Sequence, residues 1–408
     1  MKKLITLCCC LTAITTAQAQ SHEIYNPNIA SLQVMAGSDW TSLPIAQLGG
    51  NAIHIDFDEL SHEYHRYTYH IEHCEADWST SQDIYENDYM MGYNDNLTIE
   101  NYEQSLNTTQ LYTHYSLTIP NKDCRLTMSG NYKLTVTDDQ TGDKVLTACF
   151  MVYEPKVKIG LDYVTNTDID INKSHQQVRF TINYNGTRVT NPSTQIKTVV
   201  LQNRRWDNAA YNTKPDYISA DGLQWQHNRQ LIFDAGNVYR KFELLDLDHP
   251  TMGIDAINWD GKWFHAKVME DTPRPNFVYD ESAQGAFIIR NSDNNDCNYT
   301  CDYAQVHFTL KTSQQQGEVY INGDWTYAPS LPTYRMQYDE TSRCYIATIP
   351  LKQGYYSYQY LMKKNDNSYQ PINTEGNFYQ TANHYDVLVY YRGNGERTDH
   401  LIGWGFNK

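Results

Sequence analysis

Apolar and polar residues alternate strictly along the stretch Ala52-Ile53-His54-Ile55-Asp56-Phe57. Successive side chains of a β-strand point to opposite faces of the sheet, so a period of two is typical of a strand with one buried face. The same alternation recurs at residues 132–137 and 178–182, whereas no stretch of the sequence keeps a convincing helical period over a dozen residues. The sequence therefore predicts an all-β protein.

Turn signals divide these strands into short, sandwich-like runs. Residues 139–143 predict a hairpin turn, one run of strands ends near residues 153–156, and a Pro- and Asn-rich region lies at residues 271–297. Short strands with frequent turns favour β-sandwiches. We expect two to three serial sandwiches of immunoglobulin-like or E-set-like type, divided into an N-terminal sandwich at residues 20–155, a middle β domain at 156–290 and a C-terminal sandwich at 291–408.

The first 19 residues have the three parts of a secretory signal peptide. The start Met1-Lys2-Lys3 is basic, residues 4–14 are apolar, and Ala17-Gln18-Ala19 is a small-residue cleavage site. The apolar segment is too short to cross a bilayer as a helix. We predict that residues 1–19 are a signal peptide and that the exported chain starts near Gln20.

The charge balance excludes one class of partner. The 408 residues include 32 basic and 48 acidic side chains, for a net charge of −16, which becomes −18 when Lys2 and Lys3 are removed with the signal peptide. Nucleic-acid binding needs a basic surface, so we expect no nucleic-acid partner. No later segment has 18 consecutive apolar residues, so we also expect no transmembrane helix. The 34 tyrosines suit a β-rich protein.

Six cysteines remain after the signal peptide, an even number that permits three disulfides in an exported protein. They are Cys74, Cys124, Cys149, Cys297, Cys301 and Cys344. We predict that Cys344 pairs with Cys297 or Cys301 and so ties the entry of the last sandwich to one of its strands. The alternative is that the thiols are free and buried.

Histidines and acids gather at the strand pattern around residue 70. The group consists of His62, His65, His70, Glu72, His73, Cys74 and Asp77. On a strand, one face carries His70, Glu72 and Cys74, and the opposite face carries His65, Tyr67, Tyr69, Ile71 and His73. Neighbours on one face of a strand lie nearly 7 Å apart, which is wide for zinc ligands. The spacing favours ordinary strand packing, with a zinc site as the alternative.

Other motifs that carry chemistry are incomplete. Residues 168–172 resemble the start of a calcium-binding loop, but Lys173 stands where glycine is needed and Arg179 where glutamate is needed. The sequence has no nucleophile elbow, no P-loop and no dinucleotide-binding glycine motif. No spacing selects a pair of glycosidase carboxylates. We therefore predict no catalytic, metal-binding or cofactor-binding residues. We also predict that the protein is not an enzyme.

The C-terminal third resembles a carbohydrate-binding fold. A strand and turn at residues 318–325, followed by strands at 344–349 and 351–360, are similar in order to the small sandwich of starch- and glycogen-binding modules. Those modules bind sugar through exposed aromatic residues, for which Trp325 and Tyr327 are the candidates here. A periplasmic carbohydrate-binding or carbohydrate-active protein is accordingly the alternative function.

A resemblance across nearly the whole exported chain points elsewhere. The motifs lie in order at residues 73–79, 89–93, 101–108, 112–117, 129–132, 202–208, 351–358 and 387–392. In this order they resemble the Plug proteins of the type IX secretion system of Bacteroidetes-type bacteria.

This resemblance implies a periplasmic protein at the inner side of the outer membrane. It implies that the protein closes the periplasmic opening of a giant outer-membrane β-barrel translocon by steric occlusion, as a monomer in a hetero-complex. The family supplies no catalytic residues or cofactors, and it assigns no contact residue one by one.

Overall fold

The predicted all-β, serial-sandwich fold is confirmed. The computed structural model describes residues 21–92, 97–293, 296–328 and 331–407, which form three β-sandwiches and a few short helical turns. The predicted signal peptide and cleavage site lie outside the described residues. The strands follow the sequence alternation: Ile53, Ile55 and Phe57 are almost fully buried.

The first sandwich packs a six-stranded sheet on a four-stranded sheet around one apolar core. The larger sheet contains β1 (Glu23–Ile24), β12 (Lys144–Tyr153), β11 (Gly130–Asp138), β5 (Tyr67–Cys74) and β7 (Leu97–Thr98), with β3 (Ile45–Gln47) parallel to β12. The smaller contains β2 (Ile29–Ala36), β4 (Ile53–Glu59), β9 (Thr113–Ile119) and β8 (Asn101–Gln104). Helix α1 (Glu86–Tyr89) and the pair β6 (Met90–Gly92) and β10 (Cys124–Leu126) close one end. The predicted hairpin turn joins β11 to β12.

The second sandwich is built from two separate parts of the chain. One sheet contains β13 (Lys158–Val164), β14 (His175–Asn183), β18 (Gly222–Trp225) and β17 (Tyr217–Ile218), with β19 (Ile232–Asp234) also paired to β14. The facing sheet contains β16 (Arg205–Tyr211), β15 (Ile196–Gln202), β30 (Tyr385–Tyr391) and β31 (His400–Phe406). Helix α2 (Pro192–Gln195) and the 3-10 turn η1 (Arg229–Leu231) lie in its connections.

The third sandwich packs two five-stranded sheets face to face. One contains β20 (Arg240–Leu244), β28 (Gly354–Lys363), β23 (Phe287–Ile289), β25 (Glu318–Asn322) and β29 (Tyr369–Pro371). The other contains β21 (Ile254–Trp259), β22 (Phe264–Val268), β24 (Tyr303–Lys311), β27 (Cys344–Lys352) and β26 (Gln337–Asp339). Its short helical turns are α3 (Cys297–Thr300), η2 (Asp324–Thr326) and η3 (Pro332–Tyr334), and η4 (Asn373–Glu375) begins the return to the second sandwich.

The two later domain boundaries differ from those predicted. Strands β20 to β23, placed by the sequence in a middle domain at 156–290, belong to the third sandwich. Strands β30 and β31, placed in a C-terminal sandwich at 291–408, complete the second sandwich, because β30 pairs with β15 from Ile196↔Tyr391 to Gln202↔Tyr385. The third sandwich is therefore an insertion in the second. Alternation identifies a strand but not its partner, which is why the sequence reasoning missed this.

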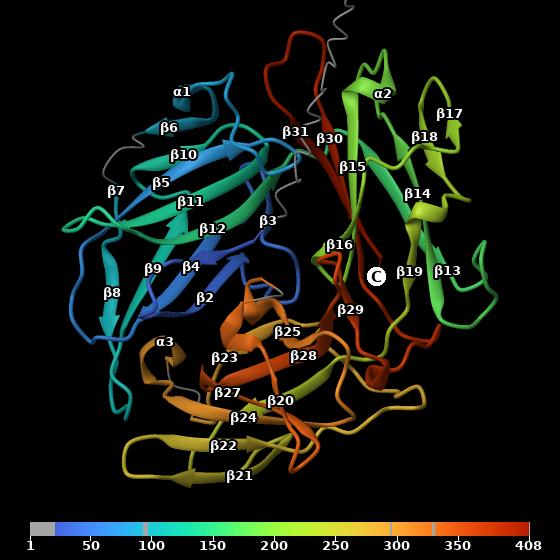
Figure 1. The fold of residues 1–408 in the computed structure, drawn as a ribbon. Helices are drawn as coiled ribbons and strands as arrows, with labels where there is room; N and C mark the ends of the chain where they lie inside the picture. Colours follow the sequence, from blue (N-terminus) through green and yellow to red (C-terminus); the bar gives the residue numbers. More distant parts are fainter. Residues whose placement is uncertain (1–20, 93–96, 294–295, 329–330, 408) are drawn as a thin grey trace, which may run out of the picture.

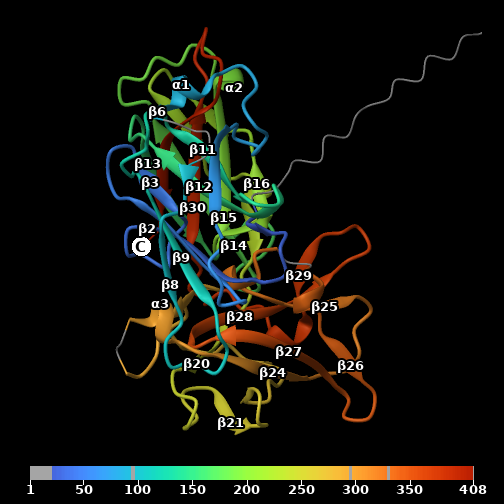
Figure 2. The same ribbon diagram turned by 90° about the vertical axis from the view of Figure 1, so that its left-hand side faces the viewer.

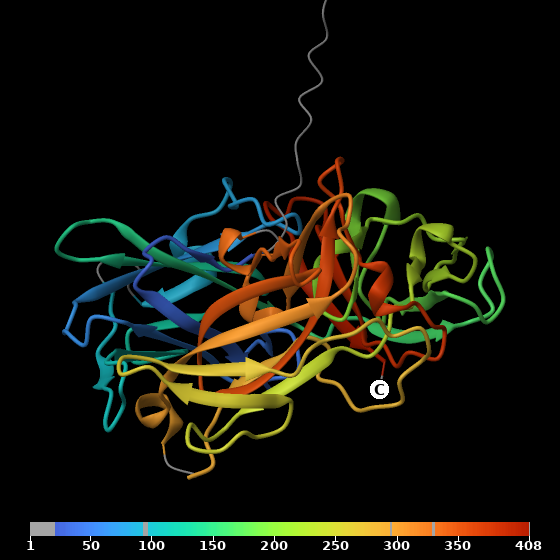
Figure 3. The same cartoon turned by 60° about the horizontal axis from the view of Figure 1, so that its bottom comes forward.

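The three sandwiches lie at the corners of a triangle (Figure 1). The first, coloured blue to teal, lies beside the second, coloured green and red, and the third, in yellow and orange, lies beneath both. Figure 2 shows the first and second as one upright slab with the third at its foot. Figure 3, with the bottom turned forward, shows the third sandwich in front of the other two. Hydrogen bonds join each sandwich to both others.

Candidate interaction sites

A buried ion cluster joins the first sandwich to the third. Asp58, at the end of β4, accepts hydrogen bonds from Lys352 Nζ at 2.7 Å and from the Tyr303 hydroxyl at 2.6 Å. His114 Nδ1 lies 2.7 Å from the other carboxylate oxygen of Asp58. The side chains of Asp58 and Lys352 are each 1% exposed. The two sandwiches therefore share a paired charge in a buried interface.

The charged forms of Asp58 and His114 are favoured despite burial. Burial raises the pKa of Asp58, but the Lys352 charge and the His114 contact outweigh it and leave the pKa below its ordinary value. Burial lowers the pKa of His114, but its contacts with Asp56 and Asp58 outweigh that effect and leave the pKa raised. Each ion is stabilised by the others, so removal of one leaves a buried charge unpaired.

The turn that contains α3 forms hydrogen bonds with a loop of the first sandwich. The Asp302 carboxylate accepts from the backbone N–H groups of Thr109 at 2.6 Å and Gln110 at 3.0 Å. The Tyr112 hydroxyl donates to the Cys301 carbonyl at 2.7 Å. The Lys352 ammonium lies 4.1 Å from the centre of the Tyr112 ring, within reach of a cation–π contact. The loop between β8 and β9 is thus held by backbone as well as side-chain contacts.

An apolar interface joins the first sandwich to the second. The Trp78 and Trp206 rings meet edge to face with centroids 5.5 Å apart. The buried residues around them come from both sandwiches: Leu43, Ile45, Ala76, Cys149 and Met151 from the first, and Val199, Leu201, Leu388, Tyr390 and Leu401 from the second. The outer face of the six-stranded sheet of the first sandwich is therefore buried against the outer face of the four-stranded sheet of the second, as in a domain core.

A charged network borders this apolar interface. Asp399 of the second sandwich accepts from Lys197 at 2.7 Å, from Arg392 at 3.0 Å and from the backbone N–H of Ala76 at 3.0 Å. Glu75 of the first sandwich pairs with the same Arg392. The network fixes the angle at which the two sandwiches meet.

Arg204 reaches all three sandwiches from a tight turn of the second. The turn joins β15 to β16, and both of its central residues, Asn203 and Arg204, have positive φ, which is typical of a two-residue hairpin. The Arg204 guanidinium donates to the Thr41 carbonyl at 2.6 Å, to Asp324 at 2.9 Å and to the Ala283 carbonyl at 2.8 Å. Its side chain is 4% exposed. The sequence motif at residues 202–208 therefore contains the side chain that connects the three sandwiches.

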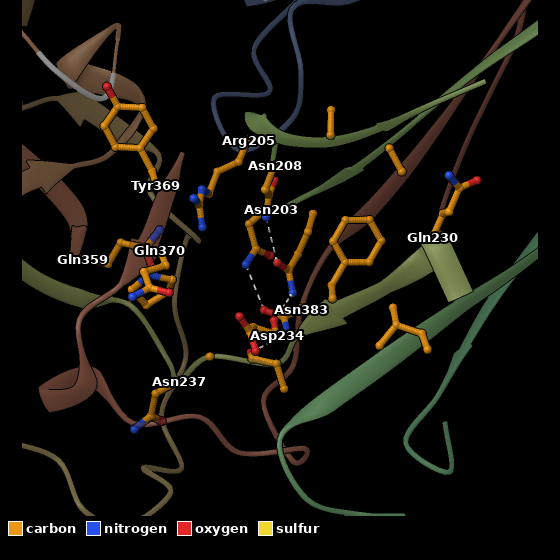
Figure 4. A pocket seen from close by; sticks show the side chains of 18 of the residues that line it. Asn203, Arg205, Asn208, Gln230, Asp234, Asn237, Gln359, Tyr369, Gln370 and Asn383 are labelled. Carbon is orange, nitrogen blue, oxygen red and sulfur yellow. Dashed lines mark hydrogen bonds between the residues drawn. The ribbon is translucent and has the colours of Figure 1, made fainter. Parts of the chain in front are cut away.

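A polar cavity lies between the second and third sandwiches. Its volume is about 450 Å³, and the second sandwich lines it with β16 and the chain around β19. The third sandwich contributes Gln359 and β29. Figure 4 shows Gln359, Tyr369 and Gln370 on one side of the cavity and Asn208, Asp234 and Gln230 on the other.

Exposed apolar side chains follow one edge of the molecule, where the β8–β9 loop meets the β21–β22 turn. The Gln110 side-chain amide donates to the Lys262 carbonyl at 2.7 Å and so joins the loop to the turn. This edge, which we call the β8–β21 edge, carries Tyr64, Tyr102, Leu106, Leu111 and Trp259. Each is between 42% and 55% exposed, and the rings of Tyr64 and Tyr102 lie 4.6 Å apart.

The histidine group at residues 62–77 is divided by strand β5. His73 points into the core, bonds Ser81 at 2.9 Å, and has its pKa lowered to about 4 by burial. His65 lies at the rim near Glu59 and Asp138, and His62 bonds the Tyr112 carbonyl at 3.0 Å. Asp170 of the calcium-like segment contacts His175 at 2.6 Å. Within the described ranges, no group of three or more His, Cys, Asp or Glu side chains is arranged to hold a metal ion.

The predicted disulfide of Cys344 with Cys297 or Cys301 is wrong. Cys344 forms no disulfide with any residue that the structure describes. In the ladder between β24 and β27, Cys344 lies opposite Lys311 at one end, and Lys352 lies opposite Tyr303 at the other. Cys301 is two residues before Tyr303, so it lies at the end of the ladder away from Cys344. Eight residues of strand span about 27 Å, and a disulfide needs Cα atoms within about 7 Å.

The aromatic residues proposed for sugar binding are not on the surface. Trp325 is 2% exposed and packs edge to face against Tyr356, with centroids 5.5 Å apart. Tyr327 is partly buried against the core of the first sandwich. The expected carbohydrate platform is instead part of the packing of the third sandwich and its junction.

No pattern in the sequence indicates the Asp58–Lys352 pair. These residues lie 294 positions apart, and each follows an ordinary strand pattern. Arg204 lies in the motif at residues 202–208, so the sequence marked this residue as a candidate. The motif did not indicate that Arg204 connects the three sandwiches.

Comparisons with known proteins agree with this architecture. Residues 29–154 match the family model described as the first domain of the type 9 secretion system plug protein. A crystal structure of a hypothetical protein from Parabacteroides merdae is similar, with a TM-score of 0.92 and 38% sequence identity over 95% of this chain and 98% of that chain. No curated protein matches the sequence. Among the described residues, no helix is both long and apolar enough to cross a membrane.

Proposed function

This chain belongs to the plug protein family of the type 9 secretion system, and on that premise we propose that it closes the periplasmic opening of the outer-membrane translocon barrel by steric occlusion. In this proposal the protein is exported through its signal peptide and resides in the periplasm, at the inner side of the outer membrane. It acts as a monomer in a hetero-complex with the barrel, without catalysis.

The observation that carries the proposal is the locking of three sandwiches into one wide body. A plug that bent at its domain junctions would leak, and here each junction is fixed. The Asp58–Lys352 pair fixes the first to the third, the Trp78–Trp206 contact fixes the first to the second, and Arg204 contacts all three. Such contacts favour rigidity over the relative motion expected of small polar domain interfaces.

The β8–β21 edge supplies a surface for the contact with the barrel. Aromatic residues dominate the energetics of protein interfaces when they are buried at the centre. A stable contact covers at least about 1,000 Å², and this edge spans two sandwiches. The protein's negative charge acts mainly on the rate of encounter.

Deletion of the gene tests occlusion. Without the plug, barrels that no other partner covers should admit large solutes, so the cells should become sensitive to vancomycin-sized antibiotics. Deletion of the barrel as well should abolish the effect because no pore remains. An unchanged permeability barrier, in cells shown to assemble the barrel, would instead favour a role in assembly.

Pull-down from detergent-solubilised envelopes tests the partner and the edge. The tagged wild-type protein should recover one very large outer-membrane barrel. The double variant Tyr102→Ser and Trp259→Ser should recover less than a tenth as much. Tyr279→Ser is the matched control, because Tyr279 is 96% exposed but lies outside the β8–β21 edge. Equal loss with the control would remove the edge from the proposal.

A further inference from the structure

Strand β16 has an open edge. It ends the sheet β16-β15-β30-β31, so its side away from β15 has no partner strand in the part of the chain that the structure describes. The Asn212 N–H donates to the Thr198 carbonyl, and Val199 pairs with Tyr211. In an antiparallel ladder this makes Val199 and Tyr211 a pair without mutual hydrogen bonds, whose backbone groups point outward. Tyr211 and, two residues earlier, Ala209 thus present N–H and C=O groups to the open side.

This open edge borders the polar cavity. Four successive residues of β16, 208–211, line the cavity. Side chains of successive residues point to opposite faces of a sheet, so a run of four can line one space only at the strand's edge. On the far side, around β19, the backbone is already bonded: the Asp234 carbonyl accepts from Gln202 at 2.8 Å, and the Ala235 carbonyl accepts from Asn383 at 2.7 Å.

The lining is rich in carboxamides and contains one cation, Arg205, and one anion, Asp234. The amide-bearing residues are Gln202, Asn203, Asn208, Gln230, Asn237, Gln359, Gln370 and Asn383 (Figure 4). Several are held in place by one another, as in the bonds from Asn203 to Asn383 at 2.8 Å and from Asn208 to Gln202 at 3.2 Å. The cation at the rim, Arg205, is paired with Asp207. The anion of the lining, Asp234, lies 3.4 Å from His175 and accepts from the Asn377 amide at 2.9 Å, so both charged residues of the lining already have partners.

Two lining groups have no hydrogen-bond partner among the residues that the structure describes. They are the side-chain oxygens of Asn208 and Thr213, both buried. A buried polar atom without a partner costs about 1–3 kcal/mol. A ligand or a water molecule in the cavity gives each of them a partner.

We propose that this cavity binds an extended, uncharged segment of another polypeptide, which adds to β16 as a further strand. A peptide backbone alternates donors and acceptors at the spacing of the open edge, and carboxamides both donate and accept. The recess between two sandwiches keeps the edge from pairing with other copies of the chain. The inference goes beyond pore closure and does not rest on it, because the binding is measured on the purified protein.

A random 12-residue peptide library displayed on phage, selected against the purified full-length protein, tests the proposal. Enriched peptides, synthesised with a fluorescent label, should bind in polarisation assays. Ala209→Pro should weaken binding at least tenfold, because proline removes one outward N–H and is tolerated on edge strands. Ala209→Ser is the matched control and should bind like the wild type. Both variants should melt within a few degrees of the wild type.

Methylation of the peptide keeps the test valid if Ala209→Pro does not fold. N-methylation at alternate peptide positions should abolish binding, whereas methylation at the intervening positions should not. This periodicity of two is specific to a strand added to an edge. The proposal is overturned if no peptide is enriched, if binding ignores both changes, or if a glycan array finds oligosaccharide ligands at this cavity instead.

Discussion

At the scale of single residues, the buried cluster around Asp58 makes the strongest prediction. Lys352→Met leaves the buried Asp58 carboxylate with only His114 and the Tyr303 hydroxyl beside it. Breaking a buried ion pair in this way should lower the free energy of unfolding by about 3–5 kcal/mol. Lys267→Met is the matched control, because its 2.7 Å pair with Asp255 is exposed, and exposed pairs contribute less than about 1 kcal/mol. Denaturant titration of both variants measures the difference, and equal losses would contradict the role of burial.

The same cluster predicts how stability depends on pH. The pKa of Asp58 is lowered by folding, so its contribution is present above its unfolded value of about 4 and is lost as pH falls through the folded pKa. The pKa of His114 is raised, so its contribution is complete below about pH 6.5 and is lost as pH rises through the folded pKa. Stability should therefore decline above pH 6.5.

His114→Asn should remove that decline, because an amide can donate to Asp58 without titrating. The free energy of unfolding, measured by denaturant titration from pH 4 to 9, checks this. His249→Asn, at an exposed pair with Asp246, is the control and should keep the wild-type profile. A decline that persists unchanged in His114→Asn would assign it to another group.

Cysteine chemistry gives a second test at this scale. Burial raises the pKa of Cys74 and of Cys149 to about 12, and only the thiolate reacts readily. Iodoacetamide should therefore label both slowly in the folded protein and quickly in denaturant. Non-reducing peptide mapping should find Cys344 linked to neither Cys297 nor Cys301, and either linkage would contradict the register of β24 and β27.

At the scale of elements, the hairpin turn between β15 and β16 should act as a clamp. Arg204→Ala removes donors to the Thr41 and Ala283 carbonyls and to Asp324, and should cost about 3 kcal/mol. Hydrogen exchange at residues 283–286 should accelerate, because their segment loses its anchor. Arg229→Ala, at an exposed arginine, should change neither quantity. Unchanged exchange in Arg204→Ala would mean that the sandwiches are held by their apolar contacts alone.

The elements also show how far the sequence could lead. Alternation located strands at residues 52–57, 132–137 and 178–182, and the hairpin turn at 139–143 is where it was predicted. The partners of the strands were out of reach, because a strand's pattern records only which face is buried. Strand β30 pairs with β15, which lies nearly 190 residues earlier. The residues of β30 would have the same pattern if it paired with a strand close by in the sequence.

The candidate sites were predictable to a smaller extent for the same reason. The spacing argument correctly placed His73 and His70 on opposite faces of β5. The Asp58–Lys352 pair and the polar cavity depend on contacts between distant segments, which no local pattern encodes. Trp325 is of a residue type that can stack on sugars, and only the packing of the third sandwich shows that it is buried.

At the scale of the whole molecule, the insertion of the third sandwich predicts which parts of the chain can be removed. Truncation after residue 290 would leave two intact domains if the boundaries followed the sequence. In the structure it removes β30 and β31, so that sheet β16-β15-β30-β31 loses half its strands. The cores that lose members include Tyr385, Val387, Val389 and Ile402 in the second sandwich, and Leu388, Tyr390 and Leu401 at its contact with the first. The fragment should lack a cooperative thermal transition and near-ultraviolet circular dichroism from its second sandwich.

Deletion of residues 240–371 is the informative counterpart. The two connections to the third sandwich run side by side, because the Phe378 N–H donates to the Gly236 carbonyl at 2.8 Å and the Gly236 N–H donates to Asn377 at 2.8 Å. A short Gly-Ser bridge can therefore join them, and both sheets of the second sandwich keep all their strands. Asp58 then meets water instead of Lys352, so its charge is no longer buried and unpaired. The shortened protein should melt cooperatively, although it lacks more residues than the truncation removes from the end. If instead the fragment that ends at residue 290 melts cooperatively and the internal deletion does not, the second sandwich is not completed by β30 and β31.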